Sequence, residues 1–269
     1  MSVSIDFDNM FRISTIHTAF NTRFEKGYYF KGEFHNSWEL VIIIDGVAGI
    51  TAGSDVLVLR KGYAILHEPM EFHKIWSEGN SDMHVVVFTF KADNMPKLNS
   101  KTFIVEDLSV PLKIVDEIFN VFNSTNNHFY GIKKPNSIEC QAFLKKFELF
   151  ILDTIAKNAF SQKSISLKTA ENYTEIVHIL QDNISKNLSV PEIAELCNMS
   201  EVNLKRTFSK YSDMGVMTYF NNMKMAVALD MIKNGNTVKE TATALGFADQ
   251  NYFSTVFKRI TGHPPTYFK

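Results

Sequence analysis

The sequence predicts a multidomain protein of mixed class, with an N-terminal β-barrel accompanied by two helices and an all-α domain at the C-terminus. Three observations support this division. The chain of 269 residues is long enough for about two domains, each with its own core. Short runs of β-branched and aromatic residues recur between turn signals from residue 20 to 91. From Pro111 onward, the apolar residues follow the helical period instead.

The β-rich part is expected to occupy residues 1–110. Many short strands at close spacing are typical of a barrel or a jelly roll. Turn signals separate the strands, among them Asp45-Gly46 and Lys61-Gly62. The expected strands are residues 28–30, 40–44, 56–59, 63–66 and 85–90.

Two amphipathic helices are expected within residues 111–160. Pro111 suits the first position of a helix, and a loop over 123–127 precedes the second one. The two helices either cap the barrel or pair with another subunit, and we take them as a candidate dimerisation element. The small polar segment 161–171 is typical of a linker between domains. The apolar stripe of the second helix is Phe143, Phe147, Phe150, Ile151 and Ile155.

The C-terminal part, residues 172–269, contains one pattern twice, at about 190–211 and 238–260. Each copy is a short helix, a tight turn and a second helix, which is a helix-turn-helix unit. Ser200 and Asp249 suit the N-caps of the two second helices, and Gly246 suits a left-handed turn. A helix over 217–233, roughly 25 Å long, joins the units, so one chain can reach two successive major-groove faces ~34 Å apart. The matching apolar positions are Ala194, Cys197, Leu204 and Phe208 in the first unit and Ala242, Leu245, Phe253 and Phe257 in the second.

Composition narrows the class of protein further. The net charge is -1, from 28 basic and 29 acidic residues, so the whole chain has no basic excess of the kind that usually marks nucleic-acid binding. Two cysteines are too few for a disulfide framework. The N-terminus lacks the pattern of a signal peptide, and the most apolar run, 40–44, is far too short to span a membrane. We therefore expect a soluble, cytoplasmic protein without a membrane partner.

The segment 240–268 closely resembles the signature of AraC/XylS-type transcription regulators. The matching residues are Gly246-Phe247, Tyr252-Phe253, Phe257-Lys258, Gly262 and Pro265, with LKRTF (204–208) and Tyr219 in the first unit. The resemblance covers about residues 172–269. Three positions depart from the pattern: Asp213 stands where Gly is usual, Thr241 replaces an aliphatic residue, and Lys224 replaces an Arg of the joining helix. Asp still tolerates a left-handed conformation, whereas Thr241 is expected to loosen the second core.

The resemblance implies that the second helix of each unit contacts DNA. Arg206 can donate two hydrogen bonds to guanine, and Val202 can contact a thymine methyl group. Gln and Asn suit adenine, but none of the base-facing residues of the second unit is Arg, so the first unit is expected to supply most of the specificity. The expected base contacts are Val202, Lys205 and Arg206 in the first unit and Gln250, Asn251, Ser254 and Thr255 in the second. The expected phosphate contacts are Lys210, Lys258 and Arg259.

The first domain resembles the cupin-like sensor barrels fused to many regulators of this family. Gly27, Glu33, His35, Glu39 and Gly46 reproduce the spacing of the first metal-cupin motif, with Glu33 in place of its first His, and His73 falls near the His of the second. Glu33, His35, Glu39 and His73 are thus weak candidates for metal ligands. Three interpretations remain open: a metal-free pocket, a metal-assisted effector site and a metalloenzyme. The first is preferred, so no metal and no cofactor is expected.

The expected effector-binding residues are His35, Trp38, Glu39, Phe72, His73 and Trp76. Their aromatic rings suit stacking on a sugar-like effector, although the same rings are equally suited to a core. We therefore expect a dimeric, ligand-responsive regulator of transcription rather than an enzyme, acting as an activator on promoter DNA and RNA polymerase. The alternatives are a metal-dependent cupin enzyme with an appended DNA-binding domain, and an effector-independent regulator with a structural barrel. Residues 171–269 hold 10 basic and 10 acidic residues, which predicts a shallow salt dependence of DNA binding.

Overall fold

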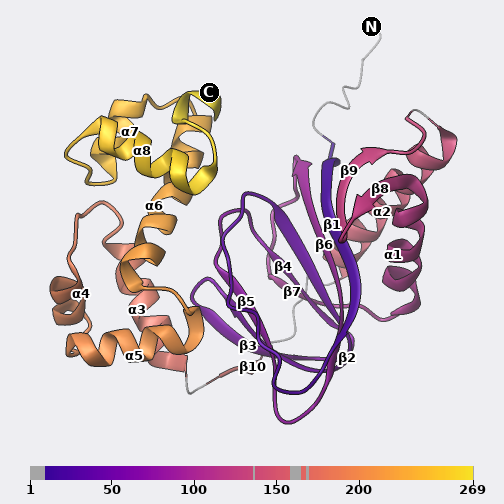
Figure 1. Ribbon diagram of the computed structural model, residues 1–269, viewed down its shortest axis with the longest axis horizontal. Helices are drawn as coiled ribbons and strands as arrows, with labels where there is room; N and C mark the ends of the chain where they lie inside the picture. Colours follow the sequence, from indigo (N-terminus) through magenta and orange to yellow (C-terminus); the bar gives the residue numbers. More distant parts are fainter. Residues whose placement is uncertain (1–9, 136, 158–164, 168–169, 269) are drawn as a thin grey trace, which may run out of the picture.

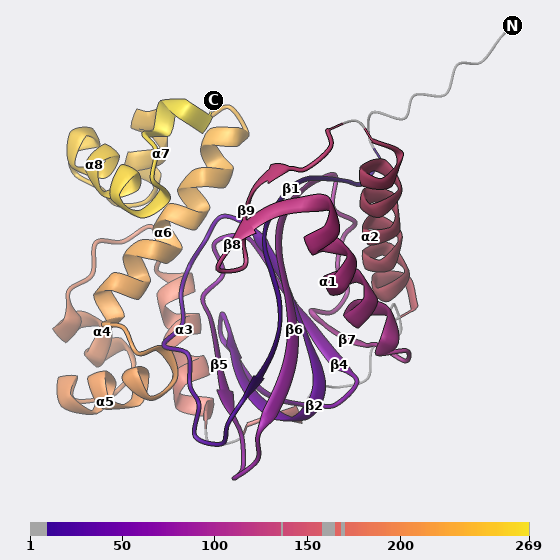
Figure 2. The same cartoon turned by 45° about the vertical axis from the view of Figure 1, so that its right-hand side comes forward.

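The computed structural model describes residues 10–135, 137–157, 165–167 and 170–268. A strand-rich N-terminal domain is followed by a helical C-terminal domain, as the sequence predicts (Figure 1). Helices α1 (Ser109–Val121) and α2 (Ile138–Lys157) lie on one side of the strands, and the C-terminal helices lie on the other side (Figures 1 and 2). Most of the expected linker, 161–171, lies outside the described residues.

Within the part of the chain that the structure describes, ten antiparallel strands form the first domain. The longest path of neighbours is β10-β3-β2-β6-β1-β9-β8, while β4 and β5 also pair with β2, and β7 pairs with β4. The strands are β1 (Arg12–Phe24), β2 (Trp38–Ala52), β3 (Asp55–Arg60), β4 (Tyr63–His67), β5 (His73–Ser77), β6 (Met83–Asp93), β7 (Thr102–Ile104), β8 (Phe122–Thr125), β9 (His128–Ile132) and β10 (Ile165–Ser166).

The long strand β2 belongs to both layers of the barrel. Its first half pairs with β4 and β6, and its second half pairs with β3 and β5. The expected turn at Asp45-Gly46 is instead an irregularity inside this continuous strand. Gly46 has a φ of 81° there, and a Cβ atom would lie 2.1 Å from the carbonyl oxygen of Asp82. Only glycine therefore allows β2 to bend between the layers.

Two other expectations for this domain were wrong in detail. Residues 28–30 form only one isolated bridge, between Tyr29 and Trp76. The expected loop over 123–127 is a hairpin of β8 and β9, which adds to the sheet beside β1. Asn126 and Asn127 both have positive φ at its turn, and asparagine adopts that conformation more readily than other side chains do.

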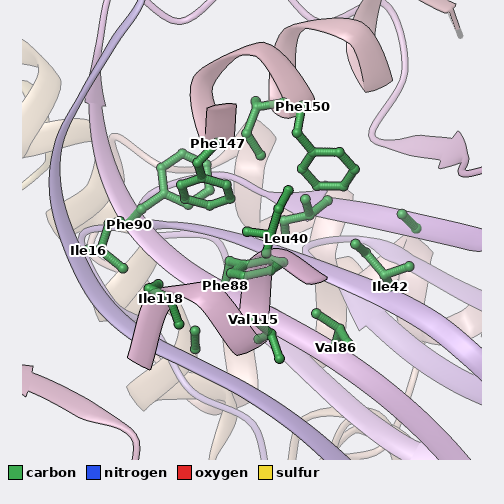
Figure 3. Packing of buried hydrophobic residues seen from close by; sticks show 14 of the residues in the cluster. Ile16, Leu40, Ile42, Val86, Phe88, Phe90, Val115, Ile118, Phe147 and Phe150 are labelled. Atoms are coloured by element: carbon green, nitrogen blue, oxygen red, sulfur yellow. The ribbon is translucent and has the colours of Figure 1, made fainter. Parts of the chain in front are cut away.

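The principal core of this domain lies between the sheet and the two helices (Figure 3). Phe147 of α2 packs on Phe88 and Phe90 of β6, with ring centroids 4.9 and 5.7 Å apart. Ile118 and Val115 of α1 complete the same cluster. The apolar stripe of α2 is thus part of the intramolecular core.

The C-terminal domain holds two separate cores that share one helix. The helices are α3 (Glu171–Asp182), α4 (Val190–Leu196), α5 (Glu201–Ser212), α6 (Val216–Lys233), α7 (Val238–Ala244), α8 (Gln250–Thr261) and the 3-10 turn η2 (Pro265–Phe268). Tyr219 and Phe220 of α6 belong to the core of the first unit, and Leu229 and Ile232 belong to that of the second. Among the described residues, no helix has the length and apolar character needed to cross a membrane.

Candidate nucleic-acid interface and ligand site

The first helix-turn-helix unit consists of α4 and α5. Ser189 and Glu192 form a capping box at the start of α4, and Asn198 supplies a left-handed turn with φ of 52°. The hydroxyl of Ser200 then accepts a hydrogen bond from the amide of Asn203, which caps α5 as expected. At its C-terminus, α5 ends on Asp213 with φ of 51°, so an aspartate does adopt the left-handed conformation there.

The second unit, α7 and α8, repeats this local geometry. Thr237 and Glu240 form the equivalent capping box, and Asp249 accepts from the amides of Asn251 and Tyr252. Gly246 has a φ of 75°, and a Cβ there would lie 2.4 Å from the carbonyl oxygen of Ser185. Similar capped turns, of four residues between α4 and α5 and of five between α7 and α8, therefore arise from local sequence signals.

The expected loosening of the second core by Thr241 was not observed. Thr241 is fully buried, and its hydroxyl donates to the carbonyl of Thr237, 2.9 Å away. Because this hydrogen bond satisfies the hydroxyl within its own helix, Thr241 leaves no polar group unpaired in the core.

The expected DNA contacts lie on the solvent side of the two recognition helices. Val202 is 77% exposed. An apolar side chain with this exposure gains no stabilisation from burial in the free protein. Arg206 donates to the Asn203 side chain at 2.9 Å, and Lys205 lies 3.4 Å from Glu201. The other residues proposed for DNA contact are also exposed, except Ser254, which is partly buried: Lys210, Gln250, Asn251, Ser254, Thr255, Lys258 and Arg259.

Lys224 joins the two units. It is 3% exposed, and its ammonium donates to the carbonyls of Lys186 and Leu245, both at 2.6 Å. Its charge also lies over the rings of Phe220 and Phe247. Burial lowers the pKa of this lysine to about 8. Lys224, which departs from the family pattern, thus connects the loop before α4 to the end of α7 through the two hydrogen bonds of its buried side chain.

The barrel contains a cavity of about 740 Å³ between β1, β2 and β6. The strand register divides its wall into polar and apolar rows. Glu39, Thr89 and Thr18 lie side by side on the three strands, and the hydroxyl of Thr89 donates to Glu39. The neighbouring row is apolar, with Val41, Val87 and Phe20. The cavity is therefore amphipathic, as small-molecule sites commonly are.

Four side chains converge at one end of this cavity. The ligand atoms of Glu33, His35, Glu39 and His73 all lie within 4.8 Å of one another. His35 Nε2 lies 3.3 Å from Glu39 Oε2. His73 Nε2 lies 3.5 Å from Glu39 Oε1 and 3.7 Å from Glu33 Oε1. The spacing noted in the sequence thus becomes a three-dimensional cluster, which we call the His/Glu cluster.

The donors of the His/Glu cluster fit a divalent cation. His73 Nδ1 lies 3.1 Å from the carbonyl of Glu71, an interaction that leaves Nε2 free to act as a ligand. Among the described residues, this Nε2 is buried and has no hydrogen-bond partner. A tetrahedral ion with ligands at about 2.1 Å would place them about 3.4 Å apart. The His–Glu pairs of the cluster are 3.3–4.0 Å apart, and all four ligand atoms lie within 4.8 Å of one another, so ligation requires them to move closer together.

Electrostatics keep the Glu39 carboxylate of the cluster ionised. Burial by itself would raise the pKa of Glu39, but the hydrogen bond with His35 and the charges of His73 and His67 lower it to about 2. Burial likewise opposes the charged form of His73, yet Glu33 and Glu39 raise its pKa. The arrangement therefore favours a positive charge, whether a proton or a cation, beside the Glu39 carboxylate.

Of the residues proposed for effector binding, the structure brings only half together. His35 and Glu39 line the cavity, and His73 joins them in the cluster. Trp38 packs against the core under the helices. Phe72 and Trp76 point toward the C-terminal domain, where Phe72 lies beside Tyr219 and Trp76 beside Tyr211.

Sequence reasoning missed three polar residues beside the polar row of the cavity wall. His17, Lys91 and His128 line it, from β1, β6 and the β8–β9 hairpin. Lys91 continues the alternation of Val85, Val87 and Thr89 on one face of β6, so period two was the available signal. No local signal indicated that the hairpin carrying His128 would pair with β1.

Comparison with known proteins gives matches at the C-terminus and along the chain. A helix-turn-helix domain family model matches residues 193–269. The Msm operon regulatory protein of Streptococcus mutans is 20% identical over 284 residues, covering 100% of this chain and 97% of its own. The uncharacterized HTH-type transcriptional regulator YfiF of Bacillus subtilis is 22% identical, covering 87% and 77%. The solved structure of ToxT from Vibrio cholerae O395 covers 96% of both chains at 16% identity, with a TM-score of 0.40.

Proposed function

We propose that this chain is a sequence-specific, DNA-binding transcription regulator controlled by a small molecule in its barrel, because a helix-turn-helix domain model matches its C-terminal part. One observation carries the proposal. Two helix-turn-helix units with the same capping geometry are fixed on one helix, and the outer faces of both recognition helices are exposed. Helix α6, with 18 residues, is about 27 Å long and supports binding to successive major-groove faces.

Specific recognition is assigned mainly to α5. Arg206 is exposed and carries the planar group that suits guanine, while the exposed Val202 suits a thymine methyl group. On α8, the hydroxyls of Ser254 and Thr255 donate to carbonyls of their own helix, so their oxygens act only as acceptors there. Phosphate contacts are assigned to Lys210, Lys258 and Arg259, which position the domain without reading sequence.

The effector is assigned to the cavity of the barrel. The polar row beside Glu39 and the apolar row beside Val41 suit a small amphipathic molecule. A sugar-like effector loses the stacking support expected from Trp38, Phe72 and Trp76, because these three rings do not line the cavity. Control then follows from differential binding: the ligand must prefer one arrangement of the two domains over another.

The remaining roles are proposals that rest on the same family. We propose sensing rather than catalysis, because the two relatives matched along most of their length are regulatory proteins. We also propose a homodimer that activates RNA polymerase. Dimerisation would use outward residues of the α1–α2 pair, such as the exposed Ile138 and Leu149, because the apolar stripe of α2 is already buried.

Selection of bound duplexes from a random DNA pool, followed by binding assays on the selected sequence, tests the proposal. A recognised sequence with two blocks one helical turn apart is expected. Arg206→Ala should weaken binding to that sequence far more than binding to random DNA. As a matched control, Lys233→Ala removes a charge from α6 outside the recognition helices and should affect neither. Failure to select any sequence, or equal losses on both DNAs, would refute sequence-specific recognition by α5.

A further inference from the structure

Two neighbouring stretches of the barrel connect the His/Glu cluster to the first helix-turn-helix unit. Glu33 and His73 form a bridge in which each amide donates to the other's carbonyl, at 3.0 and 3.1 Å. Their side chains enter the cluster. The adjacent residues Phe34 and Phe72 instead contact the C-terminal domain. Alternate residues of the same backbone therefore face the ligand site and the DNA-binding domain.

The apolar part of this contact completes the core of the first unit. The rings of Phe34 and Phe72 each lie 5.3 Å from that of Tyr219 in α6. Tyr219 in turn lies 5.1 Å from Phe208, a core residue of the recognition helix α5. Phe72 is 1% exposed, and it clusters with residues of α3 to α6 rather than with the barrel core. The barrel thus supplies side chains that the DNA-binding domain buries.

Hydrogen bonds and an ion pair extend the same contact. The hydroxyls of Tyr173 and Tyr219 both donate to the carbonyl of Gly53, at 3.1 Å each. The amide of Gly53 in turn donates to the carbonyl of Phe72, which precedes His73, so this hydrogen bond links the Gly53 loop to the His/Glu cluster. Lys74, the residue after His73, is buried and forms an ion pair with Asp213, the C-cap of α5.

We propose that the His/Glu cluster binds a divalent cation and that this cation controls how firmly the first helix-turn-helix unit docks on the barrel. Ligation draws Glu33 and His73 from their present separation of 3.7 Å toward common contact with the ion. Because Phe34 follows Glu33 and Phe72 precedes His73 on the same backbone, ligation also fixes the two rings that enter the core of the first unit. Cation binding therefore stabilises the docked arrangement, and docking raises cation affinity by the same factor.

This inference rests on the proposed function only in taking the barrel as the ligand-binding domain. Its experiment needs no DNA, so its failure is distinguishable from failure of sequence-specific recognition. The full chain, without a histidine tag, is treated with a chelator and titrated with Zn²⁺ or Mn²⁺, with Mg²⁺ as the hard-ion comparison. Metal content is measured directly, and hydrogen exchange is followed in peptides of α5 and α6.

One Zn²⁺ or Mn²⁺ per chain is expected, with exchange slowed several-fold at the contact around Phe208 and Tyr219. Glu33→Gln should weaken cation affinity by at least about tenfold and abolish that protection. The Glu33 side chain is half-exposed, so this substitution leaves the packed core unchanged. Glu25→Gln, an exposed residue outside the cluster, is the matched control and should change neither. Phe34→Ala should still bind one cation per chain, with its affinity lowered by the coupling factor, but lose the protection in α5 and α6.

Several outcomes overturn the proposal. Substoichiometric metal, or equal binding by the Glu33→Gln variant and the wild type, would show an adventitious ion only. If the cluster takes up protons and binds no metal at neutral pH, the cluster shares a proton and does not bind a cation. Stoichiometric binding that protects the barrel but not α5 and α6 would refute the coupling.

Discussion

Replacing Lys224 with methionine tests how the two helix-turn-helix units are held at a fixed spacing. The lysine donates to the carbonyls of Lys186 and Leu245, one before α4 and one at the end of α7. Methionine has a similar length and fills the space between Phe220 and Phe247, but it donates no hydrogen bond. The variant therefore removes the polar tie and leaves most of the packing.

The magnitude follows from two opposing contributions. Two charge-assisted hydrogen bonds contribute about 1.5–3 kcal/mol each. Against them, the fall of the pKa from 10.5 to about 8 corresponds to about 3 kcal/mol of desolvation cost. Since methionine also leaves two buried carbonyls unpaired, we expect Lys224→Met to lower the free energy of unfolding by about 1–3 kcal/mol. Lys224→Arg keeps charged donors and should lose less.

The pH dependence gives the reasoning a second check. Because the folded pKa of Lys224 lies below its unfolded value, the unfolded chain binds more protons between pH 8 and 10.5, and this residue's contribution to stability rises with pH there. Chemical denaturation of the full chain at several pH values measures it, and the rise should be smaller in Lys224→Met.

DNA binding shows whether the hydrogen bonds of Lys224 fix the spacing of the two helix-turn-helix units. With a selected site whose two blocks are moved apart by one base pair, the wild type should lose affinity steeply, and Lys224→Met should lose less because its units are less rigidly spaced. A variant with unchanged stability, an unchanged pH profile and the wild-type response to spacing would refute this account of Lys224.

Three further predictions concern other parts of the molecule. Gly246→Ala should destabilise the second unit by at least about 1–2 kcal/mol in denaturation curves, because φ is 75° and the new Cβ meets the Ser185 carbonyl. Gly235 also has positive φ, but a Cβ there has open space, so Gly235→Ala measures the backbone strain without the steric clash. Burial raises the pKa of Tyr219, so its contribution to stability is complete below pH 10 and is lost as pH rises above that; Tyr219→Phe should reduce this alkaline loss in unfolding measured by circular dichroism. The balance of 10 basic and 10 acidic residues in 171–269 predicts a shallow slope of log affinity against log salt, and a slope as steep as that of a strongly basic protein would contradict it.

The helix-turn-helix units were predictable because their signals are local. Ser200 and Asp249 cap helices that begin one residue later, and Gly246 adopts the left-handed turn that its position requires. Each signal acts within one or two helical turns, where hydrogen bonding and steric limits on φ are decided by adjacent residues. The hydroxyl of Thr241 is likewise hydrogen-bonded within its own helix, to the carbonyl of Thr237, whereas the sequence suggested a looser core.

The barrel was less predictable because strand pairing is not local. Asn126-Asn127 is a hairpin signal that went unrecognised, since the surrounding polar residues resemble a loop. The aromatic residues Trp38, Phe72 and Trp76 were assigned to the effector on proximity in sequence. Extended segments present alternate residues to opposite faces, and sequence does not say which face the cavity occupies.

The sequence by itself determined the two-domain division, the repeated helix-turn-helix units and the residue types of the His/Glu cluster, because periodicity, capping and spacing are written within short segments. Only the tertiary structure decided that Glu33 pairs with His73, and that Phe72 enters the core of a domain whose Tyr219 lies far along the chain. Burial of apolar surface has no direction, so the partner of each apolar face is settled only when the whole chain is packed.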